Sequence, residues 1–219
     1  MSNRENKAKR VPKSVPKLSV SLDEQQQQVS KDFYDFDVNF ILGDFGVGKT
    51  LTATVLALNS YNKREFNHIV ISRPIVKNSL GFLPGEMILK MQPWIHPIVH
   101  NFNICQGKDK TEKMIEDGTI EILPIDFAKG ITYKESVVIV DEFTDMNYVD
   151  FRTMITRLGK DSKLIFCGSK EQIDKSIGKN SCIDRVMTLK DSGLVGFNEL
   201  TNNHRNAVLT DIIKFLEEK

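Results

Sequence analysis

Cysteine is scarce in this chain, and the chain has no long apolar run. The three cysteines, Cys105, Cys167 and Cys182, are odd in number and too widely spaced to form a metal-binding pair, so a reducing compartment suits them. We expect all three to be buried or unreactive. No stretch approaches the roughly 18 apolar residues of a membrane-spanning helix, and the polar N-terminus does not resemble a signal peptide. These absences favour a soluble, cytoplasmic protein that is not exported and has no membrane partner.

The net charge of +1 hides an uneven distribution of charge along the 219 residues. Residues 1–17 carry six basic side chains against one acidic side chain, a net charge of +5 that leaves −4 for the remainder. Because this stretch contains Pro12, Pro16 and little apolar content, we expect residues 1–20 to form a basic, disordered tail. The tail either touches nucleic acid phosphates or stays solvated without a partner. With 40% hydrophobic residues in the chain, we expect residues 21–219 to fold as one domain.

One motif points to nucleotide binding. The segment from Gly43 to Thr50 matches G-x-x-x-x-G-K-[ST] and follows an apolar strand pattern at residues 38–42. Its glycines let backbone N–H groups surround an anion, and the helix that begins there turns its positive end toward that anion. Lys49 would reach the β- and γ-phosphates, and the Thr50 hydroxyl would take one coordination position on Mg²⁺. The alternative is a glycine-rich turn that merely joins a strand to a helix. We assign nucleotide binding to Gly43, Asp44, Phe45, Gly46, Val47, Gly48, Lys49, Thr50 and Leu51.

An acidic pair follows a second buried strand pattern. Four consecutive β-branched residues at positions 137–140 predict a parallel strand covered on both faces, and Asp141 and Glu142 come directly after it. They therefore emerge at the carboxyl edge of the sheet, where ligands bind in open α/β folds. We assign Asp141 to the metal and Glu142 to polarising a water for attack on the γ-phosphate. An acid pair at the N-terminus of a helix is the alternative, but the P-loop about ninety residues earlier favours metal and water chemistry.

Strand and helix patterns alternate along the chain. The expected strands cover residues 38–42, 68–72, 119–123, 137–140, 163–167 and 195–200. The expected helices cover residues 22–31, 49–60, 94–104, 147–158, 182–191 and 207–218. This alternation predicts an α/β fold with a mostly parallel sheet and helices on both faces.

Two further polar groupings have both a chemical and a structural interpretation. His96 and His100 are four residues apart, as two zinc ligands on one helix face would be, but Pro97 follows His96 where the zinc motif requires glutamate. Zinc binding is therefore disfavoured. Gln172 ends a polar segment after the expected strand at 163–167, which would place it beside the γ-phosphate as a sensor. A polar loop without a catalytic role explains Gln172 equally well.

Several segments together resemble the PhoH-like family of single-domain relatives of superfamily 1 helicases. The resemblance covers most of residues 22–219. Beyond the P-loop and Asp141-Glu142, it rests on Ser72-Arg73-Pro74-Ile75-Val76, Leu80-Gly81-Phe82-Leu83-Pro84-Gly85-Glu86, Ile120-Glu121-Ile122-Leu123-Pro124, Thr156 to Lys163 and Gly168 to Asp174. The Leu-Gly-Phe-Leu-Pro-Gly stretch is the most specific, because nucleotide binding in general does not require it.

The resemblance implies a RecA-like P-loop ATPase domain that binds ATP and Mg²⁺, with action on RNA among its implied functions. It implies an adenine contact from Gln26, with Gln25 as the near alternative. It also implies that Arg157 meets a phosphate, and that Arg205 contacts nucleotide as an arginine finger, unless Arg205 is a surface arginine without a role. The expected catalytic residues are Lys49, Glu142, Gln172 and Arg157.

Three positions depart from the family pattern. Asp44 brings negative charge into the phosphate loop, which weakens anion binding unless its side chain faces solvent. Thr144 stands where helicase-like relatives usually have glutamine, and Ser169 stands where they have aspartate. Coupling of hydrolysis to nucleic acid is therefore less strongly indicated than nucleotide binding.

Length bears on the mechanism, because a superfamily 1 helicase closes two RecA-like domains over ATP and this chain has room for one. We therefore expect a homo-oligomer such as a ring, with ATP at the subunit boundaries and an arginine supplied in trans. The first hypothesis is a Mg²⁺-dependent ATPase that acts on single-stranded RNA or DNA. The alternative is a nucleotide-operated switch for a protein partner, with slow hydrolysis as a timer. A small-molecule kinase is disfavoured, because the chain has no compact arginine cluster for a lid.

Overall fold

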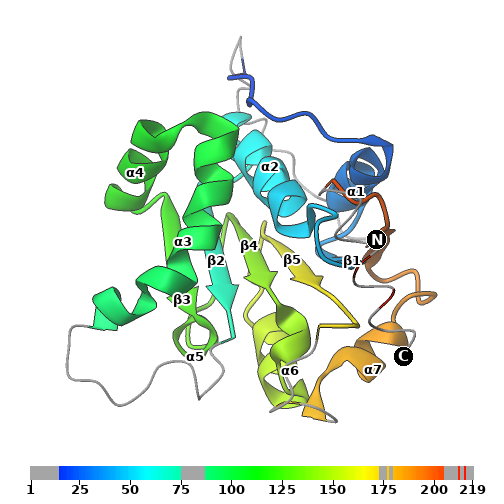
Figure 1. Ribbon diagram of the computed structural model, residues 1–219. Coiled ribbons are helices and arrows are strands. Elements are labelled where there is room, and N and C mark those ends of the chain that lie inside the picture. The colour runs from blue at the N-terminus through cyan, green and yellow to red at the C-terminus, as the bar shows by residue number, and fades with distance from the viewer. Residues whose placement is uncertain are drawn as a thin grey trace.

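The structure, a computed structural model, describes residues 15–74, 87–172, 177, 180–204, 212 and 215, and for residues 87–94 it describes the backbone alone. Within these residues, six strands form one sheet in the order β3-β2-β4-β5-β1-β6, and every neighbouring pair is parallel (Figure 1). Because the strands all run in the same direction, their carboxyl ends meet at one edge of the sheet.

The elements follow one another in strict strand and helix alternation over much of the chain. The strands are β1 (Val38–Gly43), β2 (His68–Arg73), β3 (Ile120–Pro124), β4 (Ser136–Asp141), β5 (Lys163–Gly168) and β6 (Gly196–Leu200). The helices are α1 (Glu24–Asp35), α2 (Lys49–Asn62), α3 (Met87–Gln106), α4 (Lys108–Glu116), α5 (Ile125–Ala128), the 3-10 helix η1 (Phe143–Asp145), α6 (Tyr148–Thr156) and α7 (Ile183–Met187). In Figure 1, α1 to α4 occupy the upper part of the view, and α5, α6 and α7 the lower part.

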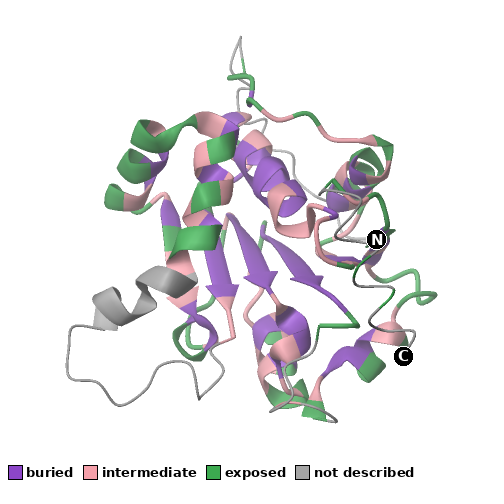
Figure 2. Ribbon diagram, in the orientation of Figure 1, coloured by how far each residue is buried: buried purple, intermediate pink, exposed green. Residues whose placement is uncertain are grey.

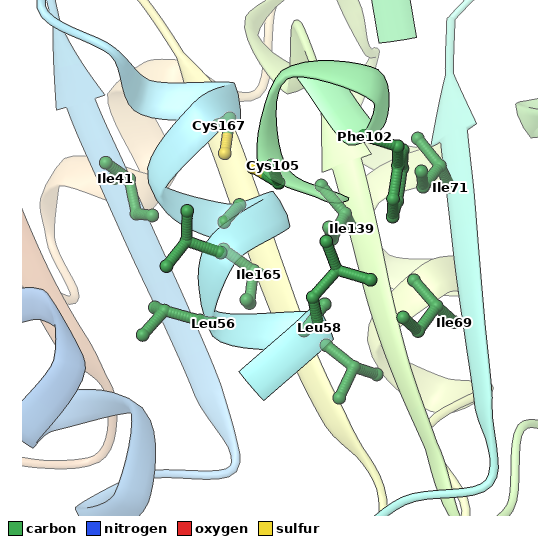
Figure 3. Packing of buried hydrophobic residues seen from close by; sticks show 14 of the residues in the cluster. Ile41, Leu56, Leu58, Ile69, Ile71, Phe102, Cys105, Ile139, Ile165 and Cys167 are labelled. Atoms are coloured by element: carbon green, nitrogen blue, oxygen red, sulfur yellow. The ribbon is translucent and has the colours of Figure 1, made fainter. Parts of the chain in front are cut away.

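One hydrophobic cluster lies between the sheet and the helices α1, α2 and α3. Successive side chains of a strand point to opposite faces, so Ile41 of β1 and Ile139 of β4 belong to this cluster while their neighbours do not. Figure 3 shows Leu56 and Leu58 of α2, together with Phe102 of α3, packed over these strand residues. This packing fixes the position of α2, the helix that begins at the phosphate loop.

A second hydrophobic cluster covers the opposite face of the sheet and contains residues of α5, η1, α6 and α7. Its centre is aromatic: the rings of Phe40 in β1 and Phe166 in β5 are stacked with centroids 5.1 Å apart, and Phe143 and Phe151 pack around them. In Figure 2 the central strands β2, β4 and β5 are coloured mostly or wholly as buried, while exposed residues lie on the outer sides of the helices. The predicted parallel sheet with helices on both faces is confirmed.

Most expected elements are present, but three helices differ from the expected ranges by several residues: α1 ends four residues later, α3 begins seven residues earlier, and α7 ends four residues earlier. Each of the six expected strands is found, and its ends differ from the expected ends by no more than one residue. The prediction missed α4 and the one-turn helices α5 and η1, because α4 is largely polar and the other two are too short to show periodicity. All three cysteines are buried and free, as expected. In the described part of the chain, we find no helix that combines the length and the apolar character needed to span a membrane. Residues 1–14, the segment 80–86, Arg205 and most of the expected helix at 207–218 lie outside the described residues.

Helix α1 is fastened at both ends, and this fixes the orientation of its glutamines. At the start, Asp23 Oδ1 accepts a hydrogen bond from the backbone N–H of Gln26, and Gln26 Oε1 accepts one from the backbone N–H of Asp23, which completes a capping box. Beyond the end, the buried Lys163 donates to the carbonyl oxygens of Tyr34 and Phe36 at 3.2 and 2.8 Å. The side chain of Gln26 therefore leaves α1 in a fixed direction, toward the first turn of α2.

Candidate nucleotide site

The phosphate loop joins β1 to α2 at the carboxyl edge of the sheet. Gly48 directly precedes α2 with φ of 78°, in the left-handed region that favours glycine. Gly43 has φ of 152°, and a side-chain carbon there would lie 2.4 Å from the carbonyl oxygen of Leu200 in β6. The two glycines therefore allow the chain to turn tightly against β6 and enter α2 with its N-terminal N–H groups at the loop.

The two charged side chains of the loop point in different directions. Lys49 Nζ donates to the carbonyl oxygens of Gly43 and Asp44, each at 2.9 Å, so its ammonium group lies across the loop. The side chain of Asp44 is exposed, and its Oδ1 accepts a hydrogen bond from the backbone N–H of Phe45 at 2.7 Å. Asp44 therefore faces solvent, the condition under which its charge weakens anion binding least.

Thr50 and Asp141 meet across the sheet edge. Thr50 Oγ1 donates to Asp141 Oδ1 at 2.7 Å, although 91 positions separate the two residues in the sequence. Strand β5 lies between β4 and β1, so the last residue of β4 and the first turn of α2 converge at the same edge. Asp141 is 6% exposed. The structure thus brings together the two residues that the sequence assigned to the metal.

Arg73 ends β2 and lies beside both acids. Its Nη1 is 4.0 Å from Asp141 Oδ2, and its Nη2 is 3.6 Å from Glu142 Oε1. Burial raises the pKa of the Glu142 carboxyl, and the neighbouring Asp141 raises it further, while the Arg73 and Lys49 cations lower it. Glu142 also has φ of 52°, a left-handed conformation that is uncommon for a residue other than glycine. A strained, partly buried carboxyl group of this kind is typical of functional sites.

The structure separates the two candidate glutamines. Gln26 Nε2 donates to the carbonyl oxygen of Val47 in the phosphate loop at 3.2 Å, so this side chain lies against the loop. Gln25 faces away from the loop toward the end of β6: its Oε1 accepts from the backbone N–H groups of Thr201 and Asn202, and its Nε2 donates to Thr201 Oγ1. Gln26 therefore lies against the phosphate loop, and Gln25 holds residues 201–202.

Residues 201–204, which follow β6, bind the outer side of the phosphate loop. Asn203 Nδ2 donates to the carbonyl oxygen of Phe45 at 3.1 Å, and the backbone N–H of His204 donates to the carbonyl oxygen of Gly46 at 3.0 Å. The His204 ring lies near Gln26, with Nε2 3.4 Å from Gln26 Nε2 and 3.1 Å from Asp23 Oδ2. The start of α1, the phosphate loop and the end of β6 therefore form one hydrogen-bonded unit.

These elements enclose a cavity of about 550 Å³. Its lining residues come from the segment before α1, from α1, the phosphate loop, α2, α3, and the ends of β4, β5 and β6. They are Val20, Ser21, Gln26, Phe45, Gly46, Gly48, Lys49, Thr50, Leu51, Asn101, Glu142, Gln172 and His204. We call the part of the cavity around Lys49 its phosphate end, and the part lined by Gln26 and His204, which lie beside Gly48, its second end. Most residues that the sequence assigned to nucleotide binding, and three of the four assigned to catalysis, line this one space.

Some expected residues lie elsewhere. Arg157 follows α6, and its carbonyl oxygen accepts from the backbone N–H of Tyr133, before β4 begins. That position is at the amino edge of the sheet, on the order of 20 Å from the carboxyl edge at about 3.3 Å per strand residue. Arg157 therefore does not reach the cavity of its own chain. Thr144 and Ser169 are fully buried and do not line the cavity.

Sequence reasoning gave no site role to Arg73 or His204. Arg73 had a detectable signal, because it directly follows a buried strand pattern and so obeys the same rule that located Asp141. His204 had none, because its approach to Gln26 depends on how residues 201–204 fold back over the phosphate loop.

Comparison with known proteins places this chain in a family. A family model described as PhoH-like protein matches residues 20–217. A PhoH-like protein of Bacillus subtilis (strain 168) is 36% identical over 147 residues, which cover 66% of this chain and 46% of that protein. A PhoH-like protein of Synechocystis sp. is 33% identical over 176 residues, which cover 79% of this chain and 54% of that protein. The chain thus spans about half the length of the curated relatives it matches.

Two solved structures share the fold at low sequence identity. The SWI2/SNF2 ATPase core of Sulfolobus solfataricus in complex with dsDNA has a TM-score of 0.51 and 14% identity, over 84% of this chain and 38% of that chain. The large terminase of a thermophilic bacteriophage has a TM-score of 0.54 and 11% identity, over 89% of this chain and 50% of that chain. The fold is therefore the RecA-like fold of helicase and ATPase domains.

Proposed function

This chain belongs to the PhoH-like family, and from that premise we propose that it is a Mg²⁺-dependent ATPase that acts on single-stranded nucleic acid, RNA in particular. The observation that carries the proposal is the cavity in which Lys49 and Thr50 of the phosphate loop face Glu142. The phosphate loop after β1 can bind phosphates, and the acid pair after β4, two strands away in the sheet, can serve the metal and the attacking water. A glutamine beside the loop can contact the base.

The residues at the phosphate end fit Mg²⁺. The Thr50 hydroxyl and the Asp141 carboxylate lie side by side, 2.7 Å apart. Both are hard oxygen ligands, which Mg²⁺ prefers. The described residues contain no group of three or more His, Cys, Asp or Glu side chains that could hold a metal, which agrees with a cation bound mainly through phosphates and water. When bound, Mg²⁺ would neutralise charge on the β- and γ-phosphates.

The chain's own residues supply the remaining chemistry. Lys49 and the N–H groups at the start of α2 bind phosphate oxygens and stabilise the charge that spreads over them during transfer. Glu142 orients a water molecule and accepts its proton as the water oxygen attacks the γ-phosphorus. The bond from the γ-phosphorus to the bridging oxygen breaks, and ADP leaves. Arg73 Nη2, 3.6 Å from Glu142 Oε1, holds the carboxyl group of Glu142 in place.

The second end of the cavity suits adenine. Gln26 is 4% exposed, and its fixed amide still has one N–H and one acceptor position beyond the bonds it makes within the protein. Adenine offers a matching amino donor and ring-nitrogen acceptor, whereas guanine offers two acceptors at the corresponding edge. We therefore assign adenine recognition to Gln26.

The proposal is tested by ATP hydrolysis with and without single-stranded RNA or DNA, in wild type, Lys49→Ala and Glu142→Gln. We expect Lys49→Ala to lose nucleotide binding, and Glu142→Gln to bind ATP but hydrolyse it at least a hundredfold more slowly, in line with loss of a general base. Lys113→Ala and Glu116→Gln, two exposed positions on α4, are the matched controls. Normal nucleotide affinity in Lys49→Ala would refute the site, and absence of both stimulation and binding by nucleic acid at low salt would refute that partner.

We further propose that the active form is a homo-oligomer, a ring being one such arrangement, with ATP at the subunit boundaries. The position of Arg157 supports this, because at the amino edge it can meet only a phosphate that is bound by another chain. An arginine supplied in trans accelerates phosphoryl transfer by roughly 10³ to 10⁵. Mass measurement at micromolar protein with Mg²⁺ and a non-hydrolysable ATP analogue tests it. A monomer that hydrolyses ATP at the full rate contradicts it.

A nucleotide-operated switch for a protein partner is the second candidate function. It is favoured by Thr144 and Ser169, which replace the glutamine and aspartate of helicase-like relatives and are buried outside the cavity. The two candidates differ in one observable, because the switch requires partner affinity to change between the ATP and ADP states without nucleic acid present.

A further inference from the structure

The orientation of the Gln26 amide is set by two hydrogen bonds inside the protein. Its Oε1 accepts from the backbone N–H of Asp23 at 3.1 Å, and its Nε2 donates to the carbonyl oxygen of Val47 at 3.2 Å. Rotating the amide by 180° would put donor against donor and acceptor against acceptor. One N–H of Gln26 therefore remains available to a base, provided that no stronger acceptor captures it.

A stronger acceptor lies close by. The Asp23 carboxylate uses Oδ1 to cap α1, and its Oδ2 is directed toward the same region as the Gln26 amide. The pKa of Asp23 is lowered, first by the hydrogen bond from the Gln26 backbone and also by Asn202 and His204, so the group is a carboxylate at neutral pH. A hydrogen bond to a charged acceptor is roughly twice as strong as one to a neutral acceptor such as a base nitrogen. Asp23 Oδ2 already accepts one hydrogen bond from Asn202 Nδ2 at 3.2 Å, and a carboxylate oxygen has a second acceptor position. Left empty, that second position would compete with the base for the N–H of Gln26.

His204 occupies that second acceptor position. Its Nε2 is 3.1 Å from Asp23 Oδ2, and because a carboxylate cannot donate, the proton of this contact must be on Nε2. Gln26 Nε2, at 3.4 Å from the same nitrogen, therefore meets a donor and does not use its second N–H there. The ring is held in place by the bond from the His204 backbone to Gly46, and its side chain is 49% exposed at the wall of the cavity.

We propose that His204 is a positioning residue for base recognition: by donating its Nε2 proton to Asp23, it keeps the second N–H of Gln26 free to face the adenine. The inference rests on the proposed ATP binding and adds to it the residue that sets base specificity. The inferred role concerns only the second end of the cavity, so we expect phosphate binding to be unchanged.

The test compares the affinities of ATP, GTP and inorganic tripolyphosphate for the full chain. His204→Phe keeps a ring at the cavity wall but removes the donor to Asp23, and His204→Gln restores an N–H donor without the imidazole. We expect His204→Phe to reduce the preference for ATP over GTP by roughly three- to tenfold, the equivalent of one hydrogen bond. We expect His204→Gln to recover most of that preference. Tripolyphosphate affinity is expected to stay unchanged in both variants, and His100→Phe, an exposed histidine on α3, is the matched control.

Three results would overturn the inference. One is an unchanged ratio of ATP to GTP affinity in His204→Phe. The second is a loss of tripolyphosphate affinity by the same factor as ATP affinity, which would mean that His204 only supports the phosphate loop. The third is a His204→Gln variant no better than His204→Phe. A failure of the proposed function is distinguishable from all three, because it shows in Lys49→Ala, which would then bind ATP as wild type does.

Discussion

Removing the charge of Asp44 is expected to strengthen nucleotide binding. Asp44→Asn keeps the oxygen that accepts from the Phe45 backbone at 2.7 Å, so the turn of the loop is preserved while one negative charge is lost. Because the side chain is exposed, its repulsion of the phosphates acts through water. Two unit charges about 8 Å apart in water repel by roughly 0.5 kcal/mol, and a Mg²⁺-bound triphosphate carries about two net negative charges, so we expect about 1 kcal/mol, or roughly fivefold tighter binding.

Calorimetric titration with a non-hydrolysable ATP analogue and Mg²⁺, at low and high salt, measures this effect. The gain is expected to shrink as salt rises, since the Debye length falls from about 10 Å at 0.1 M to about 3 Å at 1 M. Asp109→Asn, at an exposed position on α4, removes the same charge far from the cavity and is expected to leave affinity unchanged. If Asp44→Asn binds more weakly than wild type, or if its gain is the same at every salt concentration, the electrostatic reasoning is wrong.

Three further predictions concern stability and reactivity. Gly43→Ala is expected to lower the free energy of unfolding by about 2 to 4 kcal/mol in urea titrations, because the new carbon would lie 2.4 Å from the Leu200 carbonyl oxygen. Gly107→Ala is the control: nothing lies within 4 Å of the new carbon, and we expect a smaller decrease in the free energy of unfolding. Lys163→Met is expected to lose about 1 to 3 kcal/mol in the same assay, since two carbonyl oxygens at the end of α1 lose their donor, and an unchanged midpoint would contradict that role. Burial raises the pKa of the Cys105 thiol to about 11. The unfolded thiol ionises first, so the stability contribution is complete below the unfolded pKa of about 8.5 and is lost as pH rises toward 11; a thiol reagent at pH 8 should therefore label Cys105 only after unfolding.

Local patterns were sufficient to predict the strands and the metal-binding pair. The β-branched run at 137–140 could only be a covered strand, so the acids after it had to emerge at an edge, and the structure places Asp141 against Thr50. Gln26 and Gln25 could not be separated by spacing alone. The side chain of Asp23 separates them, because as the helix cap it makes Gln26 the third residue of α1, where the capping bond directs the side chain toward the phosphate loop.

Contacts between distant segments could not be predicted from one sequence. Arg73 reaches Asp141 because β2 pairs with β4. The residue pattern of a single strand does not determine its neighbours in a parallel sheet. The approach of His204 to Asp23 depends on the path of the chain after β6. Helix α4 was missed because charged residues outnumber apolar ones in its sequence, and it is helical largely through packing against α3 and β3, a tertiary effect that intrinsic propensity does not contain.

The two bonds from Lys49 to the carbonyl oxygens of Gly43 and Asp44 give this ammonium group two roles. An ammonium has three donors, so the same nitrogen can brace the loop from within while its remaining proton is offered outward. Substituting Lys49 by an uncharged residue therefore removes two hydrogen bonds that stabilise the loop as well as a positive charge. A lower nucleotide affinity of such a variant combines both effects. Arginine would not separate them, because its planar fork cannot point toward two neighbouring carbonyls and an outside oxygen at once.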